Sequence, residues 1–472
     1  MVDVAIIGGG VIGAFCAREL RKYAISVAVL EGAEDVAAGA SKANSGIVHA
    51  GYDAENGTLK AKFNVAGNKL MSKVCEELGV GYRNNGSLVL AERNRVGVLS
   101  QLKERGEKNG VKGLEVIDRA RALALEPHLG DGVAAALYAP TGGIVCPFQL
   151  TIAAMGNAMD NGASLYCGFE VAAAEKTDGG WSLVSSYHKR VEARCVVNCA
   201  GLNAAKVAAM FGDDSFRIGA RKGEYILLDK IAPPFVRHTV FAVPTAAGKG
   251  VLVTPTTDGN VLIGPTSAEG EFDTSVRRNG FDEITKKASS MLKNIPFGET
   301  ISSFAGVRAY SDRHDFIIEE SDETENLINV AGIESPGLTS APAIGEYVAA
   351  LCAEKFHARR NENFDPMRQR NRFKDLSAEE KNEIIARRPD YGKVVCRCEN
   401  VTLGEILDAL RQNPPARTLD GVKFRTRAGM GRCQGGFCQP SVFNTLMQEY
   451  GYRAQEITKK GKNSFVITGG EL

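Results

Sequence analysis

Residues 2–31 read VDVAIIGGGVIGAFCARELRKYAISVAVLE, and this stretch decides the fold. The pattern predicts a short apolar strand over 2–7, a glycine turn, a helix over 14–23 and a second strand over 26–31. A strand, a glycine turn, a helix and a strand in this order are typical of a dinucleotide-binding unit with a parallel sheet. The second strand ends in an acid, as that unit requires.

The glycine spacing Gly8-x-Gly10-x-x-Gly13 has a separate physical reason at each position. Gly8 allows a tight turn, Gly10 lets the backbone approach a pyrophosphate, and Gly13 lets the helix lie close to the strand. The helix N-terminus presents free N–H groups to the phosphates. Glu31 would accept hydrogen bonds from ribose hydroxyls. A glycine triplet alone marks only a turn, so the flanking strands and the acid support this interpretation.

Length and composition restrict the remaining possibilities. A chain of 472 residues exceeds one ordinary core, which predicts two or three domains. The net charge of +1 argues against nucleic acid or an anionic membrane as the main partner. The first strand starts at Val2, so we expect no signal peptide, and no apolar run reaches the roughly 18 residues that a membrane span needs. We therefore expect a cytoplasmic protein without a transmembrane segment.

The order of the predicted elements indicates an α/β fold with a discontinuous Rossmann-like domain. Residues 217–310 are rich in strands and predict an inserted antiparallel sheet, whereas the strand at 327–332 and the helix at 341–353 return to the first domain. The expected division is 1–80, 146–216 and 305–356 for the cofactor domain, 81–145 and 217–304 for the substrate domain, 357–392 for a linker and 393–472 for a small C-terminal α domain.

The chain has eleven cysteines, which argue for buried thiols and a metal site rather than disulfides. Seven stand singly in apolar surroundings and are expected in the core: Cys16, Cys75, Cys146, Cys167, Cys195, Cys199 and Cys352. Four cluster near the C-terminus as Cys396-x-Cys398 and Cys433-x₄-Cys438.

Four thiolates from two short loops make an iron–sulfur or a zinc site. The one-residue and four-residue gaps are unusual for zinc and favour iron–sulfur, with free thiols as the remaining alternative. Gly435 and Gly436 would let backbone N–H groups point at inorganic sulfide. Arg425, Arg427 and Arg432 would offset the thiolate charge.

Residues 394–450 resemble the small [2Fe–2S] domain of bacterioferritin-associated ferredoxin, through the four cysteines, Glu399, Ile406 and the run 422–431. The first 355 residues resemble the glycine-oxidase/D-amino-acid-oxidase superfamily of flavoproteins, in its branch of glycerol-3-phosphate and L-2-hydroxyglutarate dehydrogenases. The motifs that carry this second resemblance are NSGIVHAG at 44–51, GTLKAK at 57–62, GGIV at 142–145, KGEY at 222–225, AGVR at 305–308 and SPGLT at 335–339. The fused arrangement is similar to the large subunit of anaerobic-type glycerol-3-phosphate dehydrogenases.

The resemblance implies non-covalent FAD and a [2Fe–2S] cluster. It implies that Val171 offers its backbone to the adenine and that the helix at Gly337, Leu338 and Thr339 caps the flavin, where its dipole would stabilise the reduced ring. The full set of expected cofactor residues is Gly8, Gly10, Val11, Ile12, Gly13, Glu31, Ser41, Asn44, Ser45, Gly46, Val171, Ala200, Gly201, Gly306, Gly337, Leu338 and Thr339.

Three residues are expected to act on the substrate. His49 would accept the alcohol proton, and the alternatives are a structural histidine or a covalent flavin link. Arg308 would bind the substrate anion, and the alternative is a structural ion pair. Tyr225 is a further candidate, as is Lys222 from the same predicted sheet. His314 is expected in a charged surface turn, and the alternative is that it helps to orient the substrate.

Three functions compete. The first is oxidation of sn-glycerol-3-phosphate to dihydroxyacetone phosphate, with electrons passing from flavin through the cluster to a partner, a second flavoprotein or a quinone-linked subunit that would place the enzyme peripherally at a membrane. The second is the same chemistry on L-2-hydroxyglutarate or another hydroxy or amino acid. The third is a flavoprotein whose cluster domain only docks or senses.

Overall fold

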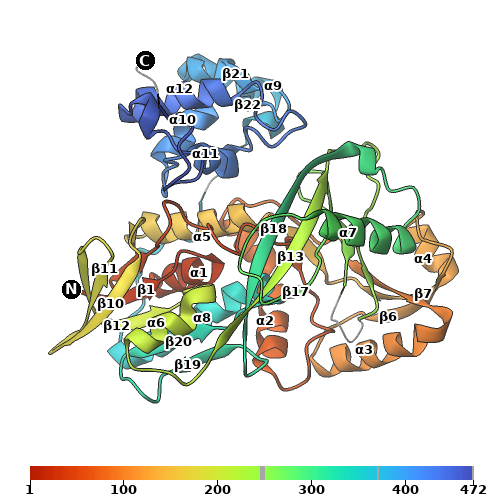
Figure 1. Cartoon of the computed structure of the whole chain (residues 1–472), viewed down its shortest axis with the longest axis horizontal. Coiled ribbons are helices and arrows are strands. Elements are labelled where there is room, and N and C mark those ends of the chain that lie inside the picture. The colour runs from red at the N-terminus through yellow and green to blue at the C-terminus, as the bar shows by residue number, and fades with distance from the viewer. Residues whose placement is uncertain (245–249, 369–371, 470–472) are drawn as a thin grey trace.

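The computed structural model describes residues 1–244, 250–368 and 372–469. Two sheets form the larger part of the molecule, and a small helical domain at the C-terminal end packs beside one helix of the first sheet (Figure 1). This is the mixed α/β architecture that the sequence predicts.

The first sheet has a parallel centre in the order β9-β2-β1-β12-β20. These strands are β1 (Val2–Ile7), β2 (Val27–Leu30), β9 (Ser164–Tyr166), β12 (Arg190–Asn198) and β20 (Leu327–Ala331). The antiparallel strands β10 (Val171–Thr177), β11 (Gly180–Ser185) and β19 (Ile317–Glu320) extend it. Neighbouring strands come from distant parts of the chain, so the prediction of a discontinuous first domain is confirmed.

Alternate residues of β1 explain why both faces of this sheet are covered. Val4 and Ile6 belong to one apolar core and Ala5 and Ile7 to another, as expected for a buried parallel strand. The first core packs under α1 (Val11–Leu20), α2 (Leu59–Glu77), α5 (Pro147–Asp160) and α8 (Gly337–Phe356). On the other face lies α6 (Ala204–Met210). The first helix begins at Val11, earlier than predicted, directly after the glycine turn.

The second sheet runs in the order β17-β13-β16-β15-β14-β5-β7-β6, with β18 on the other edge of β13. Its strands are β5 (Ser87–Glu92), β6 (Glu115–Asp118), β7 (Val133–Ala139), β13 (Ile218–Leu228), β14 (Thr239–Ala242), β15 (Leu252–Pro255), β16 (Val261–Gly264), β17 (Ala268–Glu269) and β18 (Thr300–Ser311). Its pairs are antiparallel except β5 with β14, which are parallel and join its two chain segments. Since β18 runs to Ser311 in this sheet, the boundary expected after residue 304 falls inside a strand.

Smaller elements complete the two sheets. The helices α3 (Val96–Lys108), α4 (Arg119–Leu125) and α7 (Arg278–Met291) lie beside the second sheet, and β3 (Ile47–Val48), β4 (Tyr82–Arg83) and β8 (Gly143–Val145) form a short third sheet. Helix α7 was not predicted from the sequence, and it lies within the region that was predicted to be rich in strands. In the described ranges no helix is long and apolar enough to cross a membrane.

The C-terminal domain is a hairpin followed by three helices around a small core of Ile406, Val422 and Leu446. Its elements are β21 (Val394–Cys396), β22 (Val401–Thr402), α10 (Leu403–Arg411), α11 (Leu419–Thr426) and α12 (Gln439–Tyr450), preceded by α9 (Ala378–Arg387). Short 3₁₀ turns occur at Arg93–Arg95, Gly201–Asn203, Phe297–Glu299, Phe373–Asp375, Pro389–Gly392 and Ala454–Glu456. Helix α11 contacts α5, which joins this domain to the first one (Figure 1).

The first part of the expected linker is fixed to the first domain. The Asn361 N–H donates to the Lys22 carbonyl at 2.9 Å, and the Arg368 N–H donates to the Glu77 carbonyl at 2.7 Å. The Asp365 carbonyl accepts from the Asn157 side chain. This segment therefore extends the first domain before the chain crosses to α9.

Six of the seven single cysteines are buried as expected. Cys167 is the exception and is exposed, because it follows β9 at the edge of the first sheet.

Candidate functional site

A cavity of about 970 Å³ lies where residues of both sheets meet. Its volume is at the upper end of ordinary ligand pockets, which suits a long cofactor together with a small substrate. Sixteen of the residues expected at the cofactor and substrate line it: Gly8, Gly10, Val11, Ile12, Glu31, Ser41, Asn44, Ser45, His49, Val171, Ala200, Gly201, Tyr225, Arg308, Gly337 and Leu338.

The glycine turn at one end of the cavity leaves no room for side chains. Gly8 has a φ of +111°, and a Cβ there would lie 2.5 Å from the Cys199 carbonyl oxygen. A Cβ on Gly13 would lie 2.0 Å from the Gly8 carbonyl oxygen. The turn thus presents bare backbone and the N-terminus of α1 to the cavity, the arrangement that binds a pyrophosphate.

Glu31 fixes the loops on either side of it. Its carboxylate accepts the Gly9 N–H at 2.6 Å and the Ala33 N–H at 2.8 Å. Burial raises the pKa of Glu31, and these two N–H groups oppose that rise. Glu31 also lines the cavity, so the same carboxylate can face a ribose.

The small-residue loop after β2 is shaped by its own polar groups. The Val11 N–H, at the start of α1, donates to Ser41 Oγ at 2.8 Å. Asn44 Nδ2 donates to the Ala40 carbonyl at 3.0 Å, and the Gly46 N–H donates to Asn44 Oδ1 at 2.9 Å. These bonds hold Ser41 and Asn44 at the cavity wall before any ligand binds.

Four residues expected at the cofactor do not line the cavity: Gly13, Gly46, Gly306 and Thr339. The three glycines are sites of close backbone packing, because a Cβ on Gly46 would lie 2.5 Å from the Val145 carbonyl oxygen and one on Gly306 1.9 Å from that of Ala43. The Thr339 hydroxyl is buried and bonds to the backbone of Ile47 and His49. These four residues therefore pack behind the cavity wall and do not form part of it.

His49 lies at the other end of the cavity with its backbone fixed. Its N–H donates to Thr339 Oγ1 at 2.9 Å, and its carbonyl accepts from Asn64 at 2.8 Å and Asn68 at 3.1 Å. Its Nε2 lies 3.3 Å from Ser335 Oγ. The sequence analysis did not assign a role to Ser335, although it stands directly before Pro336 and Gly337 at the start of α8.

Arginines on adjacent strands face the same end. Arg308 of β18 is directly opposite Arg221 of β13, and both line the cavity. Arg221 donates to Glu269 at 2.7 Å and to Glu334 at 3.0 Å. Arg308 Nε is buried and has no hydrogen-bond partner among the described residues. An unmatched guanidinium N–H in a cavity is a ready donor for a carboxylate or phosphate.

Tyr225 joins this group from β13. Burial raises its pKa, although the neighbouring Arg308 opposes the rise, so its hydroxyl stays protonated. Its ring stacks on Phe304 with centroids 4.9 Å apart. Tyr225 is therefore a rigid, neutral hydrogen-bonding group beside Arg308.

Of the two weaker candidates, Lys222 lies outside the cavity and His314 lies at its wall. Lys222 is buried outside the cavity and pairs with Glu271 at 3.1 Å and Asp273 at 3.0 Å, so it is structural. His314 lies in an exposed turn, as predicted, and it also lines the cavity, where it could orient the substrate.

The four C-terminal cysteines gather as two pairs. Cys398 Sγ lies 3.7 Å from Cys433 Sγ, close to the spacing of about 3.8 Å between thiolates on a tetrahedral metal with bonds of about 2.3 Å. Cys396 and Cys438 form the second pair through a hydrogen bond between their side chains. Each pair could supply the two thiolates that one iron of a two-iron cluster needs.

Each pair holds one thiol ready to ionise. The Cys438 thiol hydrogen-bonds to Cys396 and lowers the pKa of Cys396 to about 6, against the effect of burial. The Phe437 N–H lowers the pKa of Cys433 in the same way. Because backbone N–H groups already point at these sulfurs, the loops fit an iron–sulfur cluster, whose assembly would displace the remaining thiol protons.

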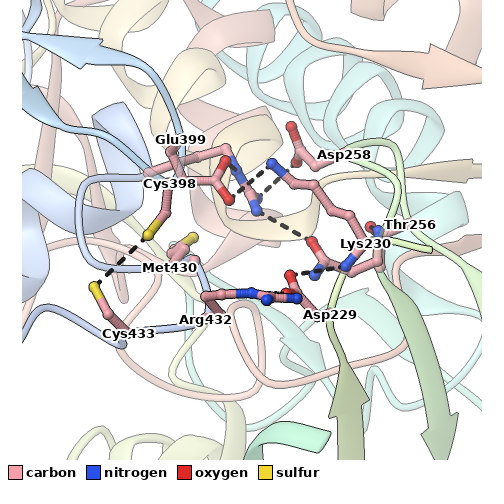
Figure 2. A network of polar contacts seen from close by, with 12 residues as sticks. Asp229, Lys230, Thr256, Asp258, Cys398, Glu399, Met430, Arg432 and Cys433 are labelled. Carbon is pink, nitrogen blue, oxygen red and sulfur yellow. Dashed lines mark hydrogen bonds and ion pairs between the residues drawn. The ribbon is translucent and has the colours of Figure 1, made fainter. Parts of the chain in front are cut away.

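The three arginines expected to offset the thiolates bind carboxylates of the larger domains. Arg425 donates to Asp35 at 2.7 and 2.8 Å, Arg427 to Asp258 at 2.8 Å, and Arg432 to Asp229 at 2.8 Å. Figure 2 shows Cys398 and Cys433 beside Arg432 and Asp229. The cluster loops thus lie at a domain interface.

Comparison with protein families gives two matches. Residues 3–351 match the family described as FAD dependent oxidoreductase, and residues 394–448 match the BFD-like [2Fe-2S] binding domain. The two ranges agree with the two resemblances drawn from the sequence, and they account for both cofactor expectations.

Among curated proteins, the chain is 45% identical over 476 aligned residues to a glycerol 3-phosphate dehydrogenase of Caloramator mitchellensis, covering 99% of this chain and 98% of that protein. It is 30% identical to a mitochondrial L-2-hydroxyglutarate dehydrogenase of Pongo abelii, over 75% of this chain and 88% of that protein. Among solved structures, the FAD-bound L-alpha-glycerophosphate oxidase of Mycoplasma pneumoniae matches with a TM-score of 0.75 and 28% identity, covering 78% of this chain and 99% of that one.

Proposed function

The chain belongs to the FAD dependent oxidoreductase family and carries a BFD-like [2Fe–2S] binding domain, and on this premise we propose that it is a dehydrogenase of sn-glycerol-3-phosphate. When bound, FAD accepts the hydride from C2 of the substrate. The hydroxyl proton goes to a base of the protein, and the product is dihydroxyacetone phosphate.

The observation that carries the proposal is the match to the glycerol 3-phosphate dehydrogenase of Caloramator mitchellensis. It spans 99% of this chain, and so includes the cavity and the cluster domain together. The cavity supports it independently, because Arg308 lines the cavity and its buried Nε has no described hydrogen-bond partner, so its guanidinium is available for an anionic alcohol.

Each residue at that end has a proposed role. Arg308 binds the phosphate of the substrate, and Tyr225 beside it donates a further hydrogen bond. His49 accepts the hydroxyl proton, and Ser335, 3.3 Å from its Nε2, orients the imidazole. At the other end, the turn from Gly8 to Gly13 and the N-terminus of α1 hold the pyrophosphate of FAD.

We also propose that the cluster receives electrons from the flavin and passes them to a partner protein, a second flavoprotein or a quinone-linked subunit. Cys398 is exposed and Cys433 half-buried, which favours exchange with a partner. Phe437, between the ligands Cys433 and Cys438, is 87% exposed and offers an apolar contact. The alternative is a cluster domain that only docks or senses.

L-2-hydroxyglutarate is the second candidate substrate. The specific support is the relative of Pongo abelii, which is 30% identical over 75% of this chain. Arg308 could bind a distal carboxylate as well as a phosphate, because a guanidinium forms two parallel hydrogen bonds with either group.

Anaerobic absorbance of the purified protein tests the substrate. We expect glycerol-3-phosphate to bleach the flavin bands and L-2-hydroxyglutarate to leave them unchanged. The reverse result would establish the second candidate, and no bleaching with either would refute both. Bleaching of the cluster bands after the flavin bands would support the electron route over a docking role.

A further inference from the structure

A buried charged network joins the cluster domain to the second sheet. Its centre is Arg427, whose Nε donates to Glu399 Oε2 at 2.8 Å and whose Nη1 donates to Asp258 Oδ2 at 2.8 Å. Lys230 pairs with Glu399 at 2.8 Å, and Arg372 pairs with Asp258 at 2.7 Å. We call these five residues the Arg427 network. Figure 2 shows the Lys230 side chain reaching Glu399, with Asp258 nearby.

The network lies between the two sites of the molecule. Glu399 directly follows the cluster ligand Cys398 in the chain. Asp258 lies in the turn that follows β15, and β15 starts at Leu252, which lines the large cavity. One strand and one ion pair therefore connect the wall of the cavity to the ligand loop.

Charges within the network do not balance. Its three cations face two carboxylates. Arg372 also pairs with Asp375 at 3.7 Å, but Lys374 adds a positive charge near Asp258 and Glu399, so four cations face three carboxylates. Asp258 and Glu399 are the most buried members, with 3% and 1% of their side chains exposed. The bound cluster carries negative charge from its thiolates, and reduction adds one more negative charge. An excess positive charge beside the ligand loop favours the reduced cluster.

The backbone conformation of Arg427 is unfavourable for an arginine, and the contacts of the network offset that cost. It ends α11 with a φ of +72°, a position at which glycine is usually found. An arginine there is strained relative to glycine. Its ion pairs and its hydrogen bond to Asn260 Oδ1 at 3.2 Å offset that strain.

We propose that Arg427 is a positioning residue for the cluster. It fixes the loop of Cys398 to the turn after β15, and the positive excess of the Arg427 network makes the bound cluster easier to reduce. The proposal requires a bound cluster but does not depend on which alcohol the enzyme oxidises.

Two measurements on the holoenzyme, made without substrate, test this proposal. The first is the midpoint potential of the cluster, followed by electron paramagnetic resonance under anaerobic reduction with dithionite and mediators. The second is hydrogen exchange of the segments 398–400 and 256–260. In Arg427→Gln we expect a lower midpoint potential and exchange at least about tenfold faster in both segments.

Two further variants separate charge from geometry. Arg427→Lys keeps the charge but loses the guanidinium fork, so the potential should return towards the wild-type value while exchange stays fast. Arg427→Gly relieves the backbone, so the domain should fold and show the same low potential as Arg427→Gln. Arg411→Gln is the control, because Arg411 lies in the same domain, is 58% exposed and pairs only with Glu449 among the described residues.

An unchanged potential in Arg427→Gln and Arg427→Gly would overturn the proposal, as would an equal fall in Arg411→Gln, which would indicate net charge alone. If Arg427→Gln fails to assemble the cluster, Arg427→Lys becomes the deciding variant. Because it keeps the positive charge, a low midpoint potential in Arg427→Lys would contradict the role of the charge. Failure of glycerol-3-phosphate to bleach the flavin would refute the proposed function, but the midpoint potentials and exchange rates would still test the role of Arg427.

Discussion

Replacing Arg308 by methionine removes the one guanidinium in the cavity that has a buried N–H without a described partner. Methionine has a similar length and is apolar, so the wall keeps most of its packing. Hydrogen bonds to a charged group contribute about 1.5–3 kcal/mol each, so losing two would remove about 3–6 kcal/mol of binding in the transition state. At 1.36 kcal/mol per decade, kcat/KM for glycerol-3-phosphate should fall about 160- to 25,000-fold.

Arg221→Met is the matched control for this prediction. Arg221 lies opposite Arg308 in the same sheet, but it already pairs with Glu269 and Glu334. We expect its replacement to lower kcat/KM by about tenfold or less, as for a partly exposed ion pair. Arg308→Lys should fall between the two, because it keeps the charge and loses the fork.

The assay is anaerobic stopped-flow bleaching of the flavin across a range of substrate concentrations. Reduction by dithionite, which needs no substrate site, shows that every variant carries FAD. Equal losses in Arg308→Met and Arg221→Met, or a loss below tenfold in Arg308→Met, would refute the assignment of Arg308 to the anion.

Four other perturbations have defined outcomes. His49→Asn should retain FAD and slow bleaching by glycerol-3-phosphate about 100- to 10,000-fold; near-normal bleaching would leave His49 a structural role. Gly13→Ala should abolish FAD binding, measured by the flavin-to-protein absorbance ratio, because its Cβ would lie 2.0 Å from the Gly8 carbonyl oxygen; a full flavin content would show that the helix can move. Cys433→Ser should lose the cluster bands and turnover with the physiological acceptor but keep substrate bleaching, and unchanged turnover would favour a docking role. Burial would raise the pKa of Asp258, but Arg427 and Arg372 hold it below its usual value. The stability that wild type has over Asp258→Asn in urea unfolding should therefore be present at pH 7 and shrink as the pH falls below about 4, through the lowered pKa of Asp258; a difference that does not shrink with falling pH in that range would contradict this.

Local patterns predicted the first sheet well, because each signal lies within a few residues. The apolar runs, the glycine turn and the terminal acid fall within 2–31, and the later strands read as buried runs. The pairing of β5 with β14 could not be predicted from local patterns. It joins strands about 150 residues apart in a parallel register, which no turn between them specifies. Helix α7 was missed because it lies among strands, and its buried face is only Ile284, Ala288 and Met291 after Gly280.

For the site, most of the candidate residues predicted from the sequence line one cavity, and the exceptions have a packing reason. Gly46 and Gly306 are needed for close packing behind the wall, and a motif cannot tell which side of the backbone a ligand takes. Ser335 could have been found, since a serine next to the start of a helix that points at the flavin is positioned to meet His49. Arg427 and Asp258 are 169 residues apart, and nothing local to either predicts their pairing.

The discontinuity of the first sheet has a consequence for synthesis on the ribosome. The parallel core remains incomplete until β20 pairs with β12, and α1 lacks the contact with α8 until residue 356 has been made. At about 5–20 residues per second, roughly 20–70 seconds separate β1 from α8. The nascent chain must keep the apolar face of α1 from aggregating during that interval, and FAD cannot be enclosed before it ends. The cluster domain emerges after these elements, so the surface on which it docks has left the exit tunnel before its cysteines do.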